Sequence, residues 1–387
     1  MRKVLFIPGP TEVDPDILAE LSKPVIPHYG PDWGELYNSA CEASKKIFKT
    51  KEFVTLLPLP GSVAIEMSIP NILEKEGEEV VNITNGYFGD SQGEMLRQYG
   101  AKVLEIKNKI GEGTDIEVLK EVLDLNPKVK AIYAVHNETS SGVSDNIREV
   151  AKIARKYDKL FVVDAISSFG GMEFEFDEWG VDYAVGYASK CLSSVNGVCP
   201  VAVSKRLLEH VAKRKQPPKS YFFNLQIYLK EVNEWSAIGH PHPTSVPTSV
   251  IRAFHLAQIK ALEEGLEMRY LRHRRVGKAY REAFRAMRLD VLAKEEWASP
   301  VVTAVKVPED AGNKIKALLL ERFGLMIGSG LGEAEGKVVR VGHMGITASP
   351  QYLIQLVPAF EVILKELGIV DKVGAGVEAA MEVLSKN

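Results

Sequence analysis

The chain has 387 residues, of which 45% are hydrophobic and 26% are charged, and its formal net charge at pH 7 is −3. This composition is typical of a globular protein with a substantial core and room for two domains, and it excludes a disordered or fibrous protein. A weakly acidic chain without a basic face does not favour nucleic acid as a partner.

Short runs rich in β-branched residues alternate with segments of helical length over the first part of the chain. Runs of this kind occupy residues 53–57, 80–83, 102–106, 131–135 and 160–163. The alternation predicts an α/β fold with a mainly parallel sheet that is covered by helices on both faces. Because such sheets bind ligands at the carboxyl ends of their strands, we expect the functional residues just after these runs.

The pattern changes after Pro247. A long helical stretch over residues 248–287 is followed by a smaller α+β unit. Its expected elements are strands at 301–305 and 338–341 and closing helices that begin at Pro350 and Gly374. We therefore expect a boundary inside the long helix. The predicted divisions are an N-terminal arm at 1–20, a large domain at 21–262 and a small C-terminal domain at 263–387.

Gly61, Ser62 and Val63 follow the first predicted strand, at the start of a helix. A glycine and a serine at such a turn offer free backbone N–H groups, a hydroxyl and the positive end of a helix dipole, which together bind an anion. The alternative is a plain helix cap, in which Ser62 satisfies the first helical turn. No GxGxxG motif follows any strand, so a dinucleotide site is not predicted.

The ends of two later strands carry an aromatic residue and a polar run. Phe88 is flanked by Gly86 and Gly89 and offers a flat apolar face for a stacked ring, with a core position under a turn as an equal alternative. The fourth strand ends in short polar side chains at residues 136–142, with Thr139 among them. These are suitable neighbours for the hydroxyl group of a ring-shaped ligand.

Asp164 and Lys190 are the most informative residues of the chain. Asp164 ends the apolar run at 160–163, and Lys190 follows a second short strand. A carboxylate at the far edge of a pyridine ring keeps the ring nitrogen protonated. A lysine held as a Schiff base escapes the limit that its usual pKa of about 10.4 places on an amine nucleophile. Either residue alone would more often be a turn residue or a solvated side chain, but the surrounding motifs indicate a pyridoxal-phosphate enzyme.

The sequence resembles the class V aminotransferases of the pyridoxal-phosphate fold type I superfamily, and within them the alanine–glyoxylate and serine–pyruvate enzymes. The resemblance extends over nearly the whole chain. It rests on ordered motifs at residues 8–11, 24–28, 85–89, 136–142, 163–164, 189–190 and 340–345. It implies a seven-stranded, mainly parallel sheet in the large domain, a smaller α+β domain, and pyridoxal 5'-phosphate as the cofactor.

The resemblance also implies roles around the cofactor. Lys190 takes the position of the Schiff-base lysine, and Asp164 that of the partner of the ring nitrogen. Phe88 takes the stacking position, and Thr139 the position that contacts the ring hydroxyl. The residues implied at the phosphate are Gly61, Ser62, Val63 and Ser189, where relatives commonly carry glutamine just before the lysine.

Family members are homodimers whose active sites are shared between subunits, which the resemblance implies here as well. The loop at residues 240–247 takes the position from which the partner subunit reaches the phosphate, with His242 in place of the usual tyrosine and Ser245 in place of threonine. The substrate would lie near Gly9. Its α-carboxylate would lie on Arg340, because a guanidinium fork matches a carboxylate with two hydrogen bonds.

The reaction implied is transfer of an amino group from alanine or serine to a 2-oxo acid, plausibly glyoxylate or pyruvate. Aspartate, phosphoserine or aminoethylphosphonate as the donor would require a further cation in the pocket. A cysteine desulfurase would require a mobile nucleophilic cysteine in the later half of the chain, but all three cysteines precede residue 200. A non-catalytic binding protein would have no physical reason to keep a costly buried charge pair.

Cysteine content and hydropathy bear on the location of the protein. Cys41, Cys191 and Cys199 form neither a CxxC pair nor an even disulfide framework, which suits a reducing compartment. No apolar stretch is long enough for a signal peptide or a membrane span, so we expect a cytoplasmic protein without membrane contact. The His-x-His sequence at residues 240–242 has no evident third ligand, and no metal site is predicted.

Overall fold

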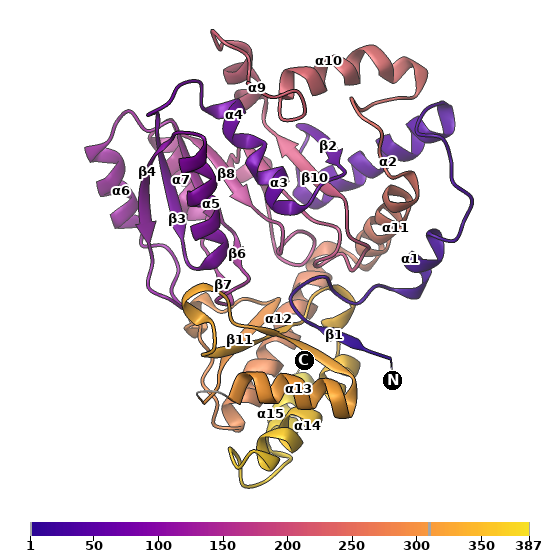
Figure 1. Cartoon of the computed structure of the whole chain (residues 1–387), viewed down its shortest axis with the longest axis vertical. Helices are drawn as coiled ribbons and strands as arrows, with labels where there is room; N and C mark the ends of the chain where they lie inside the picture. Colours follow the sequence, from indigo (N-terminus) through magenta and orange to yellow (C-terminus); the bar gives the residue numbers. More distant parts are fainter. Residues whose placement is uncertain (1, 309–310, 387) are drawn as a thin grey trace.

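The computed structural model describes residues 2–308 and 311–386 (Figure 1). A large unit built on a seven-stranded sheet forms the upper part of the view, and a smaller unit built on a four-stranded sheet forms the lower part, mostly in orange and yellow. The predicted α/β architecture, with a larger and a smaller sheet-based unit, is confirmed.

Strand order in the large sheet is β2 (Phe53–Leu57), β10 (Cys199–Val203), β9 (Tyr183–Val185), β8 (Leu160–Asp164), β5 (Ala131–Val135), β3 (Glu79–Thr84) and β4 (Lys102–Lys107). All neighbouring pairs from β9 to β4 are parallel. Only β10 runs antiparallel to its two neighbours, β9 and β2. The sheet is therefore mainly parallel, as the sequence predicts.

Both faces of this sheet are buried, and successive side chains of β5 enter opposite cores. Ile132 and Ala134 pack into one core, and Ala131 and Tyr133 into the other. The first face is covered by α2 (Pro31–Phe48), α6 (Ile116–Leu125), α7 (Ile147–Lys156), α8 (Phe176–Trp179) and α11 (Thr248–Glu264). The second is covered by α3 (Gly61–Glu66), α4 (Ser68–Ile72), α5 (Tyr87–Gln98), α9 (Lys205–Ala212) and α10 (Leu225–Trp235). Burial on both faces explains the nearly continuous apolar runs of the strands.

Order in the smaller sheet is β1 (Val4–Phe6), β12 (Leu325–Ser329), β13 (Val338–Gly342) and β11 (Val302–Lys306). Its apolar residues form a separate core with α12 (Leu266–Ala286), α13 (Ala311–Phe323), α14 (Pro350–Glu366) and α15 (Ala375–Ser385). The remaining elements are α1 (Pro15–Glu20), the hairpin of β6 (Asn137–Glu138) and β7 (Val143–Ser144), and four 3-10 turns, η1 (Ser236–Ile238), η2 (Glu295–Trp297), η3 (Gly332–Ala334) and η4 (Gly345–Thr347).

Two expectations about chain organisation differ from the structure. The helix expected over residues 248–287 is two helices, α11 and α12, because Gly265 between them has a φ of 81°, outside the right-handed helical region. The N-terminal segment, expected as a separate arm, adds a strand to the smaller sheet, since β1 pairs in parallel with β12. The domain boundary at residue 262 stays a prediction; the break in the helix lies three residues later.

No helix within the described ranges has both the length and the apolar content that crossing a bilayer requires.

Candidate active site

Asp164 and Lys190 lie in one cavity of about 460 Å³ at the carboxyl end of the large sheet. β8 delivers Asp164 at its last position, in register with Val135 of β5 and Val185 of β9. Lys190 follows β9 after a short loop. Four more of the predicted cofactor residues line the same cavity: Gly61, Ser62, Phe88 and Thr139.

The carboxyl group of Asp164 is only partly satisfied. Oδ1 accepts a hydrogen bond of 2.8 Å from the backbone N–H of Ile166, and no hydrogen bond reaches Oδ2 from the described residues. Burial raises the pKa of Asp164 to about 7, with the charge of Glu138 adding to the rise, while the Ile166 N–H and Lys190 oppose it. A cationic ring nitrogen is the kind of group that would complete this environment.

Lys190 is held between the N-terminal segment and the sheet. Its Nζ donates a hydrogen bond of 2.6 Å to the carbonyl oxygen of Pro8. The pKa of Lys190 is lowered to about 8, mainly by burial and also by the neighbouring Arg340 guanidinium, while Asp164 opposes both. Gly9 has a φ of 119°, and a Cβ atom there would lie 2.2 Å from Lys190 Nζ. Only glycine fits at this position, so Gly9 lies directly beside the lysine, as the sequence predicts for the substrate side of the site.

α3 begins at Gly61 and points its first turn at the cavity. The residue before it, Pro60, provides no side-chain cap, and Ser62 lies inside the helix and is exposed. The alternative interpretation of Ser62 as the cap is therefore wrong. The first N–H groups of a helix have no partner within it, so this turn retains free donors for an anion. Val63 and Ser189 do not line the cavity, but the hydroxyl of Ser189 is buried without a hydrogen-bond partner in the described residues.

Glu138 is a buried residue next to the site that the sequence reasoning did not single out. Its side chain is 1% exposed, and its Oε2 accepts from the backbone N–H groups of Phe88 at 3.1 Å and Gly89 at 3.0 Å. Its Oε1 accepts from Ser140 N at 2.9 Å and Ser140 Oγ at 2.6 Å. Burial raises the pKa of Glu138. The carboxylate thus fastens the start of α5, which carries Phe88, to the hairpin that carries Thr139.

Arg340 extends from β13 of the small unit toward the large one. Its Nη1 donates to Thr139 O at 3.0 Å and its Nε to Ser329 O at 2.6 Å, while Nη2 has no bond to the described residues. Burial lowers its pKa to about 10, so the guanidinium is still charged at neutral pH. Arg340 is not one of the cavity-lining residues, but its Nη1 bonds to Thr139, which is, and this contact places the guanidinium beside the site.

His242 and Ser245 lie outside this cavity. Both ring nitrogens of His242 are occupied within its own chain: Nε2 accepts from Trp33 Nε1 at 2.8 Å, and Nδ1 is 2.6 Å from Thr244 O. Burial and the neighbouring His240 lower the pKa of His242 to about 4. A neutral ring without a free nitrogen is a poor phosphate ligand, so this structure gives no support to that predicted role. Ser245 is exposed, and its contact with a partner subunit stays a prediction.

The residues present fit pyridoxal phosphate. The cavity volume lies within the range of about 300–1,000 Å³ that is typical of small-molecule sites. Asn137 lines it with a buried Oδ1 that has no partner among the described residues, although its Nδ2 donates to Ser167 Oγ. Together with the open oxygen of Asp164, the free turn of α3 and the amine of Lys190, it offers the donors and acceptors that such a ring and its phosphate require. No group of three or more candidate metal ligands occurs in the described part of the chain.

Comparison with known proteins identifies relatives over the whole length of the chain. Residues 61–221 match the family model described as aminotransferase class V. The chain is 33% identical over 386 residues to L-aspartate–glyoxylate aminotransferase of Paracoccus denitrificans, covering 98% of this chain and 95% of that protein. It is 33% identical over 390 residues to serine–glyoxylate aminotransferase of Arabidopsis thaliana, covering 99% and 95%. The crystal structure of ureidoglycine–glyoxylate aminotransferase from Bacillus subtilis matches with a TM-score of 0.92 at 28% identity, covering 100% and 99%.

These matches confirm the family resemblance, the fold type I architecture and the cofactor that the sequence predicts. They cover nearly all of both chains in each pair, so the N-terminal segment, the large unit and the small unit are all shared with these relatives. With Lys190 and Asp164 in one cavity that fits the cofactor, the chain belongs to the class V aminotransferases and is a pyridoxal-phosphate-dependent transaminase.

Proposed function

We propose that this enzyme moves the amino group of alanine or serine to a small 2-oxo acid, glyoxylate or pyruvate. The observation that carries the proposal is the convergence of three groups: the Lys190 amine and the Asp164 carboxyl in one cavity, and the Arg340 guanidinium close enough to shift the pKa of Lys190. The three relatives described above differ in their named donors but share glyoxylate in their names, which supports glyoxylate as the acceptor.

Each residue has a distinct part in this proposal. The bound cofactor supplies an electron-withdrawing ring. Asp164 would hold the proton of the ring nitrogen, and Phe88 would offer its flat face to the ring. Lys190, whose pKa is lowered to about 8, has a substantial neutral fraction near neutral pH and moves the proton at the substrate α-carbon. Arg340 binds the α-carboxylate through its free Nη2, with its other nitrogens anchored on Ser329 and Thr139.

The charge of the cavity favours a donor with an uncharged side chain. Within the described residues, Lys190 is the single basic residue that lines the cavity, and Arg340 beside it is assigned to the α-carboxylate. A second acidic group on the substrate would then lie without a counter-charge, which is costly in a buried site. This favours alanine and serine over aspartate, phosphoserine or aminoethylphosphonate.

The cysteines support neither desulfurase activity nor disulfide formation. Cys41, Cys191 and Cys199 are buried free thiols, and burial raises the pKa of Cys41 and Cys191 to about 12. Buried, protonated thiols are poor nucleophiles, so a desulfurase is not favoured. Reduced thiols are also compatible with the cytoplasm, which we propose as the location of the enzyme.

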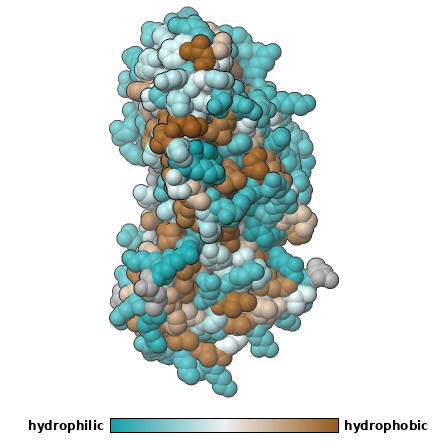
Figure 2. All heavy atoms as spheres, turned by 90° about the vertical axis from the view of Figure 1, so that its right-hand side faces the viewer, coloured by the Kyte–Doolittle hydropathy of each residue, from teal (hydrophilic) through white to brown (hydrophobic). Residues whose placement is uncertain are grey.

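We also propose a homodimer. Figure 2 shows the face on which α1, α2 and α10 lie in Figure 1, with apolar patches among its polar side chains. Val25, Tyr29, Trp235 and Ile238 are exposed, and the segments that carry them are joined, since Gly30 N donates to Ile238 O at 3.2 Å. Exposed apolar side chains on adjoining segments suit contact with a second copy of the chain. Sedimentation equilibrium should give twice the chain mass of 42.8 kDa, and a single monomeric species would contradict the proposal.

The donor can be tested with the purified enzyme loaded with cofactor. L-alanine, L-serine, L-aspartate and L-cysteine are added separately, without any 2-oxo acid, and the visible absorbance of the cofactor is recorded. Alanine or serine should bleach the yellow colour to the amino form of the cofactor in one turnover. Bleaching by aspartate alone would replace the proposed donor, and sulfide release from cysteine would revive the desulfurase. A stable yellow colour with every donor would favour a protein that binds the cofactor without catalysis.

A further inference from the structure

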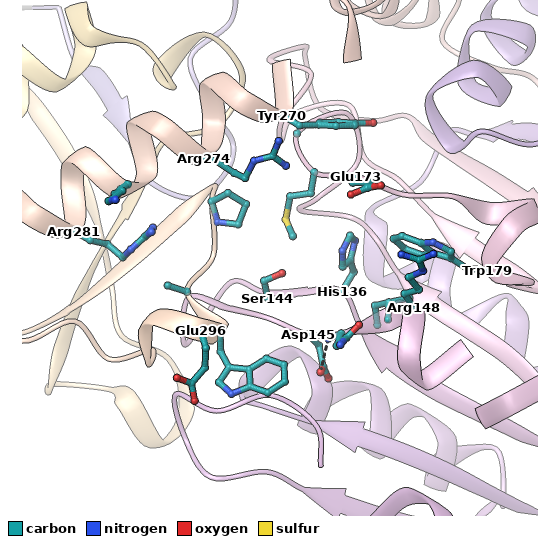
Figure 3. Close-up of a pocket in the computed structure, with 18 residues that line it drawn as sticks. His136, Ser144, Asp145, Arg148, Glu173, Trp179, Tyr270, Arg274, Arg281 and Glu296 are labelled. Carbon is teal, nitrogen blue, oxygen red and sulfur yellow. Dashed lines mark hydrogen bonds between the residues drawn. The ribbon is translucent and has the colours of Figure 1, made fainter. Parts of the chain in front are cut away.

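A second cavity, of about 540 Å³, lies at the junction of the two units and shares no lining residue with the Lys190 cavity. Figure 3 shows its walls. The large unit contributes the residues after β5, the start of α7 and the end of α8, and the small unit contributes α12 and the segment around η2. Nothing in the proposed transamination uses this cavity.

The basic residues of α12 indicate what the cavity would bind. This helix has seven arginines and lysines, and five of them are bound. Arg269 and Arg272 pair with Glu264, Arg281 and Arg285 pair with Glu295, and Arg275 donates to the carbonyl of Leu384. The other two, Arg274 and Lys278, have no ion pair or hydrogen bond in the described part of the chain, and both line the cavity. They lie one helical turn apart on the same face.

Three acidic residues line the cavity, but none of them is within ion-pair distance of Arg274 or Lys278. Its lining contains four basic residues, of which Arg148 and Arg281 pair with Glu178 and Glu295 outside it, and three acidic ones, Asp145, Glu173 and Glu296. The Asp145 carboxylate is held by neutral donors and not by a cation, since it accepts from Thr114 N at 2.9 Å, from Asn146 N at 2.8 Å and from Thr114 Oγ1. The Glu296 carboxylate points away from the middle of the cavity, whereas Arg274 reaches toward it (Figure 3). The exposed cations are therefore available to an anion.

The remaining wall is aromatic. Trp179 and Trp297, two of the four tryptophans of the chain, line the cavity together with Tyr270. Trp179 is fixed edge to face against His136, with ring centroids 6.2 Å apart and an interplanar angle of 89°. Tyr270 is 3% exposed, and its hydroxyl has no hydrogen-bond partner within the described ranges. Flat side chains beside two cations suit a ligand with both a ring and a negative charge.

The position of the cavity connects it to the active site. Val135 and Asn137 line the Lys190 cavity, while His136 between them lines the second cavity. The two units meet at the same place, where Val143 bridges to Ala298 and Ser299 N donates to Gly142 O at 2.9 Å. A ligand in the second cavity would therefore contact both units, and through His136 the segment whose neighbouring residues line the Lys190 cavity.

We propose that this junction cavity is a second ligand site, which takes a small anion attached to a flat ring. Two sources share that chemistry, a nucleoside phosphate and an aromatic carboxylate. The site is independent of the amino donor and acceptor, so it can be tested without knowledge of either.

Isothermal titration calorimetry with the full-length, cofactor-loaded enzyme tests the site. The probes are AMP and phenylacetate, each of which has a ring and an anion, with adenosine and inorganic phosphate as probes that lack one of the two. We expect saturable binding of AMP or phenylacetate, and the tighter of the two identifies the source. Adenosine and phosphate should bind more weakly, because each engages only part of the wall.

The double variant Arg274→Ala/Lys278→Ala should weaken this binding by about tenfold or more, since it removes both free cations. The matched control Lys205→Ala/Lys230→Ala removes two exposed charges from α9 and α10 and should bind the probe as the unchanged enzyme does. Transamination should be retained in both variants. Absence of binding at millimolar AMP and phenylacetate, or equal binding by the double variant, would overturn the proposal.

Discussion

Asp164 and Lys190 show how burial prepares two ordinary side chains for chemistry. The carboxyl is shifted up to a pKa of about 7 and the amine down to about 8, each mainly because its charged form is removed from water. Near neutral pH the cofactor-free protein therefore has Asp164 in both its neutral and its charged form, and a part of Lys190 is neutral although most of it is still charged. A bound ring with a positive nitrogen would restore the charge of Asp164, which couples cofactor binding to this residue.

Asp164→Asn should separate stability from function. The unfolded chain has the usual Asp pKa near 3.8, and the folded value is about 7, so the folded protein binds more protons between these values. The stability that Asp164 contributes is thus present below about pH 4 and is lost as the pH rises through 7. At pH 8 the cofactor-free Asn variant should melt several degrees higher than the unchanged protein, while its transaminase activity falls by orders of magnitude.

Thermal melts of the two cofactor-free proteins at pH 5 and pH 8 check this. The difference in Tm should grow with pH. An Asn variant that is less stable than the unchanged protein at pH 8 would mean that the carboxylate is well satisfied without the cofactor.

At the scale of elements, the strands were predictable because their signal is local. The apolar runs at 53–57, 131–135 and 160–163 became β2, β5 and β8 nearly residue for residue. The carboxyl-end rule then placed Asp164 in a ligand cavity from the sequence alone. The break in the long predicted helix lies at Gly265, and the presence of a glycine there was its one local signal in the sequence.

Contacts between distant residues could not be predicted in this way. Glu138 bonds to Phe88 N across 50 residues, and His242 accepts from Trp33 across 209 residues. Glu138 and His242 are ordinary polar residues within polar stretches of the sequence. Neither spacing nor composition indicates which distant residue each one bonds to. The phosphate role implied for His242 has no support within one chain, because Trp33 donates to the nitrogen that the role would require, and it stays a prediction for the dimer.

Glu138→Gln should disturb the link between α5 and the β6–β7 hairpin. An amide has one acceptor oxygen, so its NH₂ group would face either the two N–H groups of α5 or the donors of Ser140. We expect a loss of about 1–3 kcal/mol in the free energy of unfolding and a clear fall in cofactor affinity, because Phe88 loses its anchor.

Ser140→Ala is the matched comparison: it removes the bond from the Ser140 hydroxyl to Glu138 Oε1 and the bond that Tyr87 N donates to that hydroxyl, but leaves the bonds from Phe88 N and Gly89 N to the carboxylate in place. Urea unfolding and cofactor titration of both variants measure the effect. If the Gln variant kept normal cofactor affinity, Glu138 would be a purely structural residue.

At the scale of the whole molecule, the site is assembled from three distant parts of the chain. Lys190 of the large unit bonds to Pro8 of the N-terminal segment. Pro8 in turn lies against Gly328 of β12, which pairs with Arg340 on β13. The amine, the backbone that holds it and the guanidinium are therefore fixed relative to one another only when both sheets are formed, which explains why relatives match over the full length.

The central claim is amino transfer through Lys190 to a small 2-oxo acid. The most direct measurement is the formation of glycine from glyoxylate by the cofactor-loaded enzyme with L-serine or L-alanine as the donor, compared with Lys190→Ala and with the surface control Lys205→Ala. We predict glycine in equal amount to the 2-oxo acid formed from the donor, loss of this activity by several orders of magnitude in Lys190→Ala, and no change in Lys205→Ala. Equal activity in Lys190→Ala, or no transfer from any donor to glyoxylate or pyruvate, would contradict the account.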